Sequence, residues 1–372
     1  MTILFLTRRF YPHIGGVEKH VMEISKQLIK KGHRVVVITE APKRSEANYK
    51  SAPAEKFKKI NGIEIYRIKA GKEDWFKKFR IWKELWNLRQ IIKTADIIHC
   101  HDVFFWYLPF RFLYPRKPVY TTFHGYERFP ITKKVILMHR ISEKLSYGNI
   151  CIGDFISKWY GTKADYVSYG GVDIETQFIA GASLQLAPKH SLKNADLQDR
   201  SEAGYKPAPA ETAVFIGRLD DQTGILTYVK AFEILKKKYP NFELAVVGDG
   251  EYKPLIEKKV KVFGFQKNPE KYLRQYRFAF VSRYLSILEA MAHRRLVFAV
   301  FDNPVKEDYL KMALFSKYII IEKDENSLAA KIDFYLKYPK KEKALIDNAY
   351  KWASLQTWEQ MVDIYLKLWN NN

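Results

Sequence analysis

At 372 residues, of which 47% are hydrophobic, the chain is longer than one ordinary core requires and fits two domains of average size. Its 63 Lys and Arg residues against 41 Asp and Glu residues leave a formal charge of +22, which favours an anionic partner such as a phosphorylated substrate or an acidic membrane surface. Two cysteines without metal-type spacing argue against a disulfide framework or a zinc site, and scattered basic residues without a known binding motif argue against nucleic-acid binding.

The beginning of the chain predicts a strand over residues 3–6, a helix over residues 17–31 and a strand over residues 34–39. A strand, a helix and a strand in this succession form a right-handed parallel unit. Arg8 and Arg9 end the first apolar run early, so we do not expect a signal peptide, and no apolar run is long enough to predict a transmembrane helix. Further strands are predicted over residues 63–68, 97–100, 119–122, 149–152 and 165–167.

A change of composition separates this series from a second one. Residues from about 180 to 211 are rich in Ala, Gly, Pro, Lys and Ser and lose periodicity, which indicates a linker or mobile loop. The second series has a helix over residues 224–238, a terminal helix over 357–369, and strands over 213–216, 243–247, 260–263, 278–281, 296–300 and 318–321. We therefore expect domains over residues 1–172 and 212–352, a linker over 173–211 and a C-terminal segment over 353–372.

Two adjacent glycines, Gly15 and Gly16, lie between the first strand and the helix that follows. There the backbone can approach a ligand closely, and the helix N-terminus offers free N–H groups and a positive dipole end to an anion. A tight turn that needs glycine for a positive φ explains the pair equally well.

Two charged residues stand at comparable places in the second series. Arg218 follows the strand over residues 213–216 and is suited to a bidentate contact with a diphosphate; the alternative is a surface arginine paired with Asp220 or Asp221. Glu289 begins a predicted helix and is suited to accept hydrogen bonds from sugar or ribose hydroxyls; the alternative is stabilisation of the helix N-terminus.

Histidines occupy the ends of two predicted strands, where parallel sheets place ligands. His99, His101 and Asp102 are possible metal ligands, but successive strand residues point to opposite faces, so Asp102 does not share the face of the two histidines. We therefore expect no metal site, and His124 is the better catalytic candidate.

A basic and aromatic segment over residues 75–86 has helical spacing, with Trp75, Phe79, Trp82 and Trp86 in one stripe. Such a helix can lie in a membrane interface with its cations toward anionic lipids. The alternative is an ordinary helix that packs its aromatic stripe on the sheet. A second aromatic cluster over residues 104–110 precedes further basic residues.

Taken together, these motifs resemble those of the retaining glycosyltransferase family 4. In the first half the matching segments are Tyr11-Pro12, Gly15-Gly16-Val17-Glu18, Lys31-Gly32-His33, His99 to Asp102 and Thr122-Phe123-His124-Gly125. In the second half they are Gly170-Gly171-Val172-Asp173, Gly217-Arg218-Leu219, Val247-Gly248-Asp249-Gly250, Gly264-Phe265 and Leu288-Glu289-Ala290-Met291-Ala292. Each motif is common alone, whereas the set covers nearly the whole chain apart from the linker.

The resemblance implies the GT-B fold, in which two Rossmann-like domains with parallel sheets face each other and the C-terminal helix returns to the N-terminal domain. The N-terminal domain would bind the acceptor and the C-terminal domain the donor, a nucleotide-sugar of UDP or GDP type. The implied reaction retains the anomeric configuration and needs no metal or cofactor, so that protein cations and N–H groups stabilise the leaving diphosphate.

The resemblance also implies which residues carry these roles. His124 would lie beside the transferred sugar as the catalytic residue, while His13 and the aromatic stripe would belong to the acceptor or membrane side. The implied donor-binding residues are Gly15, Gly16, Arg218, Thr223, Gly264, Phe265 and Glu289.

The sequence departs from the family pattern at two places. Thr223 stands where the family usually has a Lys, and residues 281–287 lack the acidic, Gly-rich loop that usually precedes the Glu-Ala-Met helix. Arg283 in that segment is a candidate to replace the lost Lys charge.

We therefore expect a cytoplasmic hexosyltransferase, peripheral on the inner face of the membrane, that acts on a glycan or lipid-linked acceptor in cell-surface polysaccharide or glycolipid synthesis. The alternative is a binding or scaffold protein that keeps the fold with weakened or lost catalysis.

Overall fold

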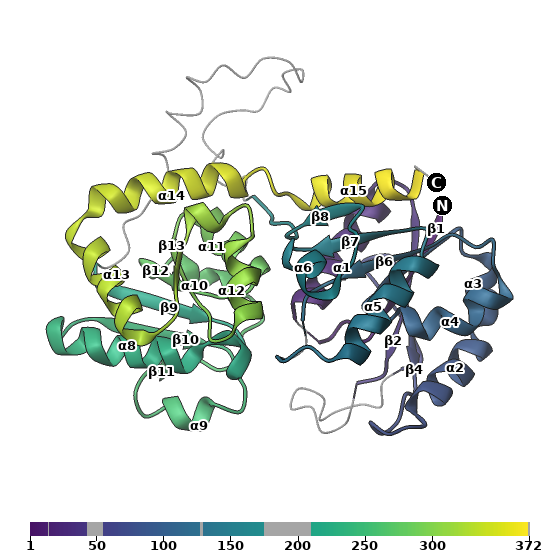
Figure 1. Ribbon diagram of the computed structural model, residues 1–372, viewed down its shortest axis with the longest axis horizontal. Coiled ribbons are helices and arrows are strands. Elements are labelled where there is room, and N and C mark those ends of the chain that lie inside the picture. Colours follow the sequence, from purple (N-terminus) through teal and green to yellow (C-terminus); the bar gives the residue numbers. More distant parts are fainter. Residues whose placement is uncertain (14, 43–54, 127–128, 175–209, 371–372) are drawn as a thin grey trace, which may run out of the picture. The chain divides into compact units, whose positions relative to one another are not determined.

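The computed structural model describes residues 1–13, 15–42, 55–126, 129–174 and 210–370, which form two compact units (Figure 1). The first unit comprises Met1–Gly171 with Trp358–Asn372, and the second comprises Val172–Thr357. Most of the predicted linker, residues 175–209, lies outside the described residues. Val172 falls in the second unit, where its N–H donates to Gln356 O (2.8 Å).

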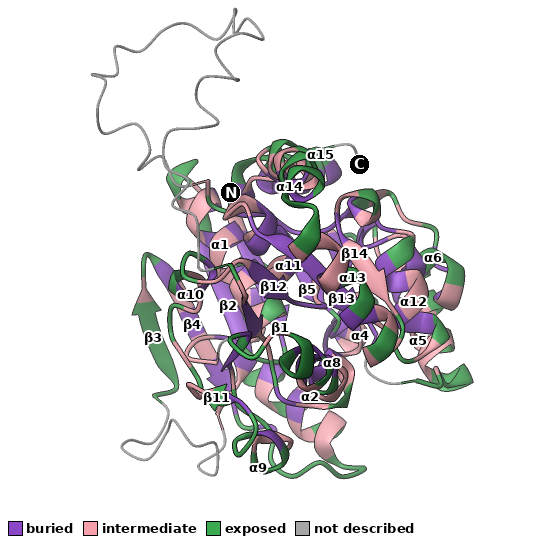
Figure 2. Ribbon diagram, turned by 90° about the vertical axis from the view of Figure 1, so that its left-hand side faces the viewer, coloured by how far each residue is buried: buried purple, intermediate pink, exposed green. Residues whose placement is uncertain are grey.

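The first unit is built on an eight-stranded sheet in the order β3-β4-β2-β1-β5-β6-β7-β8. Its strands are β1 (Thr2–Thr7), β2 (Arg34–Glu40), β3 (Phe57–Ile60), β4 (Ile63–Ile68), β5 (Ile97–His101), β6 (Val119–Phe123), β7 (Gly148–Ile152) and β8 (Tyr166–Ser168). All neighbours pair in parallel except β3 and β4. The sequence did not predict the antiparallel β3, because this edge strand is largely exposed and carries no apolar run (green in Figure 2).

The helices of the first unit cover a sheet whose central strands are largely buried, as the purple β2 and β5 of Figure 2 show. They are α1 (Gly16–Lys30), α2 (Lys77–Asn87), α3 (Arg89–Thr94), α4 (Phe104–Leu113), α5 (Lys133–Leu145), α6 (Phe155–Tyr160) and α15 (Trp358–Asn370). The C-terminal helix α15 returns to this unit as predicted, and it buries Trp358, Met361, Tyr365 and Trp369 along one face. The prediction began the C-terminal segment too early, at residue 353, which is the last residue of α14.

The second unit has a six-stranded sheet, parallel throughout, in the order β11-β10-β9-β12-β13-β14. Its strands are β9 (Thr212–Ile216), β10 (Glu243–Val247), β11 (Lys261–Val262), β12 (Phe278–Phe280), β13 (Leu296–Val300) and β14 (Ile320–Glu322). Its helices are α8 (Ile225–Lys238), α9 (Lys253–Ile256), α10 (Glu270–Leu273), α11 (Tyr284–Ala292), α12 (Pro304–Lys311), α13 (Glu325–Lys337) and α14 (Pro339–Ala353), with 3-10 turns η2 (Asp221–Thr223) and η3 (Ser316–Tyr318). The strand predicted from residue 318 starts later, because η3 ends at that residue.

Both sheets contain one point at which the strand order reverses. In the first unit this point lies between β1 and β5, and in the second between β9 and β12. Open parallel sheets bind ligands beyond the carboxyl ends of the strands at such a point. The loops that follow β1, β5, β9 and β12 are therefore the places where the fold itself predicts binding residues.

Candidate functional site

The loop that follows β9 is locked to the loop that follows β10. Gly217 N–H donates to Val247 O (3.1 Å), and Leu219 N–H donates to Asp249 O (3.0 Å). Gly248 has a φ of +151°, and a Cβ at this position would lie 1.8 Å from Gly217 O, so only glycine fits the crossing. The backbone on both sides of Arg218 is therefore held in place.

The guanidinium of Arg218 is largely exposed and is oriented by two side chains of its own loop. Its Nε lies 3.1 Å from Asp220 Oδ2, and its Nη2 donates to Gln222 Oε1 (3.2 Å). The pairing with Asp220 that the sequence offered as an alternative is thus present. It fixes the direction of the guanidinium and leaves most of the side chain accessible to a further anion.

Arg283 brings a second guanidinium to the same place from the neighbouring strand. It is the N-cap residue of α11, directly beyond β12, and its Nη2 also donates to Gln222 Oε1. Two like charges that share one neutral oxygen repel each other. The arrangement therefore favours an anionic ligand at this point, and fork-shaped arginines suit phosphate oxygens.

A buried amine, that of Lys306, lies beneath these two arginines. Lys306 is 1% exposed in the first turn of α12, and its Nζ donates to the carbonyl oxygen of Ser282, the residue before Arg283. Burial lowers the pKa of Lys306 well below 10.5, and the positive charge of Arg283 lowers this pKa further. Lys306 therefore anchors the backbone that carries Arg283.

The other predicted donor residues of the second unit lie on adjacent loops and on α11. Thr223 is buried, and its hydroxyl contacts Arg218 O (2.8 Å) and Asp220 O (3.0 Å), so it shapes the loop. Gly264 follows β11, next to the exposed Phe265, and a Cβ added to Gly264 would meet no neighbouring atom within 4 Å. Glu289 is half-buried in the second half of α11, so the alternative role at a helix N-terminus is wrong.

The glycines of the first unit open α1 in the loop that follows β1. Gly15 is the N-cap with extended backbone (φ −155°), and Gly16 is exposed with nothing within 4 Å of where a Cβ would lie. Neither residue has a positive φ, so the alternative of a left-handed turn is wrong. The open space at Gly16 is what close approach of a ligand to the helix N-terminus requires. His13 lies half-buried in the turn before them.

Histidines from β5, α1 and the loop after β6 form one cluster at the switch point of the first unit. His101 Nδ1 lies 2.8 Å from His124 Nε2, and the ring of His20 meets that of His124 edge-on with 4.8 Å between centroids. Asp102 Oδ1 accepts a hydrogen bond from the His124 backbone N–H (2.9 Å). His99 and His101 share a face as predicted, with their rings stacked 5.2 Å apart.

A chain of hydrogen bonds ties this cluster to α15. Trp369 Nε1 donates to His99 Nδ1 (3.1 Å), His99 Nε2 lies 2.7 Å from Thr122 Oγ1, and Thr122 Oγ1 lies 2.9 Å from the Tyr365 hydroxyl. The Tyr365 hydroxyl lies 2.9 Å from His20 Nε2. Since an indole only donates, the arrangement that gives every hydrogen an acceptor runs from Trp369 through to His20.

The histidines of the cluster are neutral at ordinary pH. Burial lowers the pKa of His20 to about 3, and burial together with neighbouring histidines lowers the pKa values of His99, His101 and His124 well below 6.5. Within the described ranges, no group of three His, Cys, Asp or Glu side chains is arranged to hold a metal ion. The cluster can therefore act through hydrogen bonds of neutral imidazoles.

Two family models match the chain, one in each half. The model described as Glycosyltransferase Family 4 matches residues 14–167, and the model described as Glycosyl transferases group 1 matches residues 199–352. The chain belongs to the family 4 glycosyltransferases. The first match begins near the end of the loop that follows β1 and contains the loop that follows β5, and the second match contains the loops that follow β9 and β12.

Known proteins resemble this glycosyltransferase over part or all of its length. One of them, from Arabidopsis thaliana, is a subunit of phosphatidylinositol N-acetylglucosaminyltransferase; it is 23% identical over 275 residues, which cover 67% of this chain and 52% of the relative. The chain thus matches about half of that relative's length, and it matches smaller shares of the other curated relatives.

Two solved structures show the same fold. Sucrose-phosphate synthase from Thermosynechococcus elongatus has a TM-score of 0.70 at 16% identity, and each chain covers 100% of the other. HepE from Anabaena, solved in complex with UDP, has a TM-score of 0.66 at 16% identity and covers 99% of this chain, with 100% of its own chain matched. The fold of the glycosyltransferase is therefore GT-B, as the sequence led us to expect.

The aromatic stripe of the glycosyltransferase lies on α2 and the turn before it. Trp75, Phe79 and Trp86 are exposed, whereas Trp82 is half-buried and donates its indole N–H to Phe105 O in α4 (3.0 Å). The alternative of a stripe packed on the sheet is thus wrong for the three exposed residues.

Sequence reasoning missed His20, Gln222 and Lys306, of which Lys306 had local signals. Two local signals were present: Asn303 as an N-cap and Pro304 at the first helical position predict a helix directly after the strand over residues 296–300. Such a helix puts its first turn at the carboxyl edge of the sheet, where Lys306 is found.

Proposed function

We propose that this glycosyltransferase moves a hexose from a nucleotide-sugar of UDP or GDP type to a glycan or lipid-linked acceptor, with retention of anomeric configuration and without a metal ion. Its setting is the synthesis of cell-surface polysaccharide or glycolipid, on the cytoplasmic, inner face of the membrane. The observation that carries the proposal is the convergence of Arg218 and Arg283 on one oxygen of Gln222 at the switch point of the second unit.

The two guanidinium groups supply the cations that a metal-free transfer needs at the leaving group. The acceptor hydroxyl oxygen forms the new bond to the anomeric carbon, the bond from that carbon to the diphosphate breaks on the same face, and the hydroxyl proton passes to the released diphosphate. Negative charge grows on the diphosphate during this step. Preorganised donors at Arg218 and Arg283 stabilise it without reorganisation.

Arg283 and Lys306 compensate for the lysine that Thr223 replaces. Thr223 turns its hydroxyl to the backbone and offers no charge, whereas Arg283 reaches Gln222, as does Arg218. Lys306 holds Ser282 and thereby the start of α11. The lost contact is thus replaced from the other side of the switch point, which favours a working transferase over a fold that only binds.

The remaining roles follow the family pattern. Gly264 and Phe265 would flank the base, Glu289 would accept hydrogen bonds from the ribose, and Gly16 would give a phosphate access to the N-terminus of α1. His124 would contact the transferred sugar as a neutral hydrogen-bonding partner, since its pKa lies well below 6.5. The complex of HepE with UDP supports a uridine donor.

A thermal-shift screen with UDP, GDP, ADP and their sugars tests the donor. We expect UDP or GDP to raise the melting temperature, because a ligand that binds only the folded state stabilises it. Arg218→Ala should abolish the shift, whereas Lys230→Ala should keep it. Lys230 is a matched control, since its side chain is 60% exposed and paired with Glu325, against 63% for Arg218. No shift with any nucleotide would refute the donor site, and a shift without sugar transfer would favour the binding protein.

A further inference from the structure

The helix α2 has two apolar faces, of which the fold covers one. Ile81 and Leu85 are fully buried in the core of the first unit. Trp75, Phe79 and Trp86 lie on another side and are 71%, 48% and 50% exposed. A helix needs one buried face to dock on its sheet, so the second face is free for another partner.

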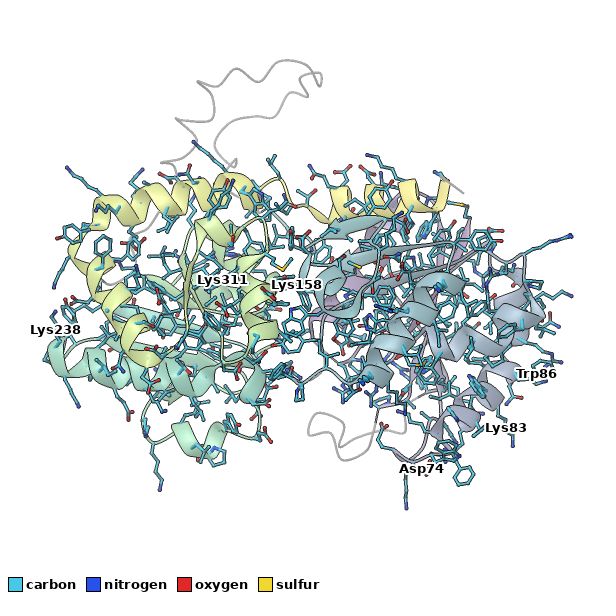
Figure 3. All side chains as sticks on the ribbon, in the orientation of Figure 1. Asp74, Lys83, Trp86, Lys158, Lys238 and Lys311 are labelled. Carbon is cyan, nitrogen blue, oxygen red and sulfur yellow. The ribbon has the colours of Figure 1, made fainter. Side chains whose placement is uncertain are left out.

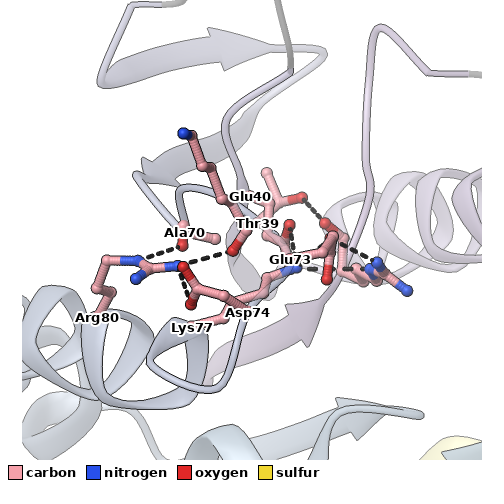
Figure 4. A network of polar contacts seen from close by, with 9 residues as sticks. Thr39, Glu40, Ala70, Glu73, Asp74, Lys77 and Arg80 are labelled. Atoms are coloured by element: carbon pink, nitrogen blue, oxygen red, sulfur yellow. Dashed lines mark hydrogen bonds and ion pairs between the residues drawn. The ribbon is translucent and has the colours of Figure 1, made fainter.

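Polar contacts fix the orientation of α2 and therefore the direction of its aromatic side. Figure 4 shows Lys77 between Glu40 and Glu73, with Nζ–Oε1 distances of 2.8 Å to each. Arg80 donates to Ala70 O (3.0 Å) and to Asp74 Oδ1 (2.8 Å). Glu40 and Glu73 are thus paired with Lys77, and Asp74 is paired with Arg80. The aromatic side of α2 remains exposed.

A cation of α2 and the first residue of α3 lie over the aromatic rings. Lys78 Nζ is 4.2 Å from the ring centre of Trp75 and 5.0 Å from that of Phe79, and Arg89 lies 5.2 Å from that of Trp86. Figure 3 shows Lys83 and Trp86 at the outer edge of the first unit. Aromatic rings and cations are therefore mixed on one surface. A typical protein–protein interface has an apolar centre and a separate polar rim.

The region carries a net positive charge. Residues 75–93 contain six basic residues and one acidic residue, and residues 104–117, which include α4, contain three basic residues and no acidic one. α4 packs beside α2 and ends in the exposed Phe112 and Leu113. None of the helices in the described part of the chain has the length and apolar character that crossing a bilayer demands. An amphipathic helix with basic and aromatic residues on one surface can lie in the plane of a bilayer surface.

We infer that the surface formed by Trp75, Phe76, Phe79 and Trp86 with Lys78, Lys83 and Arg89 binds anionic phospholipid bilayers. Trp and Phe side chains enter the interface between headgroups and acyl chains, while Lys and Arg stems reach up to the phosphates. This inference rests on the membrane-side location proposed above and adds the surface and the lipid chemistry. The nucleotide screen tests the donor site separately, so the two can fail independently.

Vesicle co-sedimentation of the full chain tests the surface. The probes are vesicles of phosphatidylcholine alone and of phosphatidylcholine with one third phosphatidylglycerol. We expect clear binding only with phosphatidylglycerol, weakened by added salt. Trp75→Ala/Trp86→Ala should bind roughly tenfold more weakly or worse, and Leu255→Ala/Leu314→Ala, which removes two exposed apolar residues of the second unit, should bind like the wild type.

Charge reversal separates a local surface from the general positive charge of the chain. Lys78→Glu/Lys83→Glu should lose roughly tenfold or more in affinity, whereas Lys237→Glu/Lys351→Glu, with the same change in net charge on exposed residues of the second unit, should lose far less. Circular dichroism and the melting temperature verify folding of each variant.

Three results would overturn the inference. They are no binding of the wild type to anionic vesicles, equal losses in the α2 variants and their controls, and occupation of the surface by a second copy of the chain, seen as a dimer that Trp75→Ala/Trp86→Ala dissociates. Retained nucleotide shifts in such a case would leave the proposed transferase intact.

Discussion

His101 Nδ1 lies 2.8 Å from His124 Nε2, while His101 Nε2 is buried and has no hydrogen-bond partner among the described residues. A buried N–H group is rarely left without an acceptor, whereas an unpaired ring nitrogen lone pair costs less. His101 therefore carries its proton at Nδ1 and donates to His124. It follows that His124 carries its own proton at Nδ1 and presents a donor there.

Nitrogen NMR of the imidazoles checks this assignment without any substrate. We expect His124 as the Nδ1–H tautomer over the neutral pH range, and His101→Ala should let His124 exchange between tautomers. Since a lost hydrogen bond is worth about 1 kcal/mol, His101→Ala should also lower the transfer rate by roughly fivefold while the donor KM changes little. A protonated Nε2 on His124 in the wild type contradicts the assignment.

Acid should destabilise the first unit through its buried histidines. The folded-state pKa of His20 is about 3, and the pKa values of His99, His101 and His124 lie well below 6.5. Below pH 6.5 the unfolded chain therefore binds more protons than the folded chain, and stability is lost as the pH falls from 6.5 toward 3. Each such histidine contributes up to about 1.4 kcal/mol per pH unit.

Urea unfolding at several pH values measures this dependence. The free energy of unfolding should fall steeply below about pH 6. His20→Asn should flatten the curve, because one proton fewer is taken up on unfolding. A pH-independent free energy of unfolding across this window contradicts the burial of neutral histidines.

Tyr365→Phe tests the hydrogen-bond chain to α15. The hydroxyl of the buried Tyr365 contacts both Thr122 Oγ1 and His20 Nε2, so its removal leaves two buried polar atoms without this partner. We expect the free energy of unfolding to fall by about 1–3 kcal/mol. The exposed Tyr338→Phe is the control and should change it by less than about 0.5 kcal/mol. Equal effects of the two substitutions would argue against the chain of hydrogen bonds.

Lys306→Met separates donor binding from stability. A buried amine with one hydrogen bond to Ser282 O stabilises the fold little, because ionising it there is costly. The substitution should therefore change the free energy of unfolding by no more than about 1 kcal/mol, yet weaken the affinity for UDP or GDP by roughly tenfold. Calorimetric titration measures the second quantity. Unchanged nucleotide affinity would place Lys306 outside the donor site.

The sequence predicts the parallel strands well and the polar contacts poorly. The strand over residues 296–300 is a continuous apolar run, as expected for a strand buried on both faces, and β13 has the same bounds. β3 shows no such run and escaped prediction. The sequence shows the aromatic stripe of α2. It does not show that the stripe is exposed, because that follows from the helix packing on the core through Ile81 and Leu85 and not through the stripe.

The contacts that could not be predicted from the sequence are those between residues far apart in the chain. His20 and Tyr365 are 345 positions apart, and no local pattern indicates that α15 carries Tyr365 to the first unit's switch point. Arg283 and Arg218 meet because β12 lies beside β9 in the sheet order, whereas Gly15, Gly16 and the strand-end histidines could be placed from the order of elements alone.

The diphosphate site is tested most directly by calorimetric titration of UDP and GDP into the wild type and into Arg218→Ala/Arg283→Ala, with Lys230→Ala as the control. We expect the wild type and the control to bind one of the two nucleotides equally well. The double variant should lose roughly a hundredfold or more in affinity, because two charge-assisted contacts are removed. Equal affinity of the double variant and the wild type, or no binding of either nucleotide by the wild type, would contradict a donor site at these arginines.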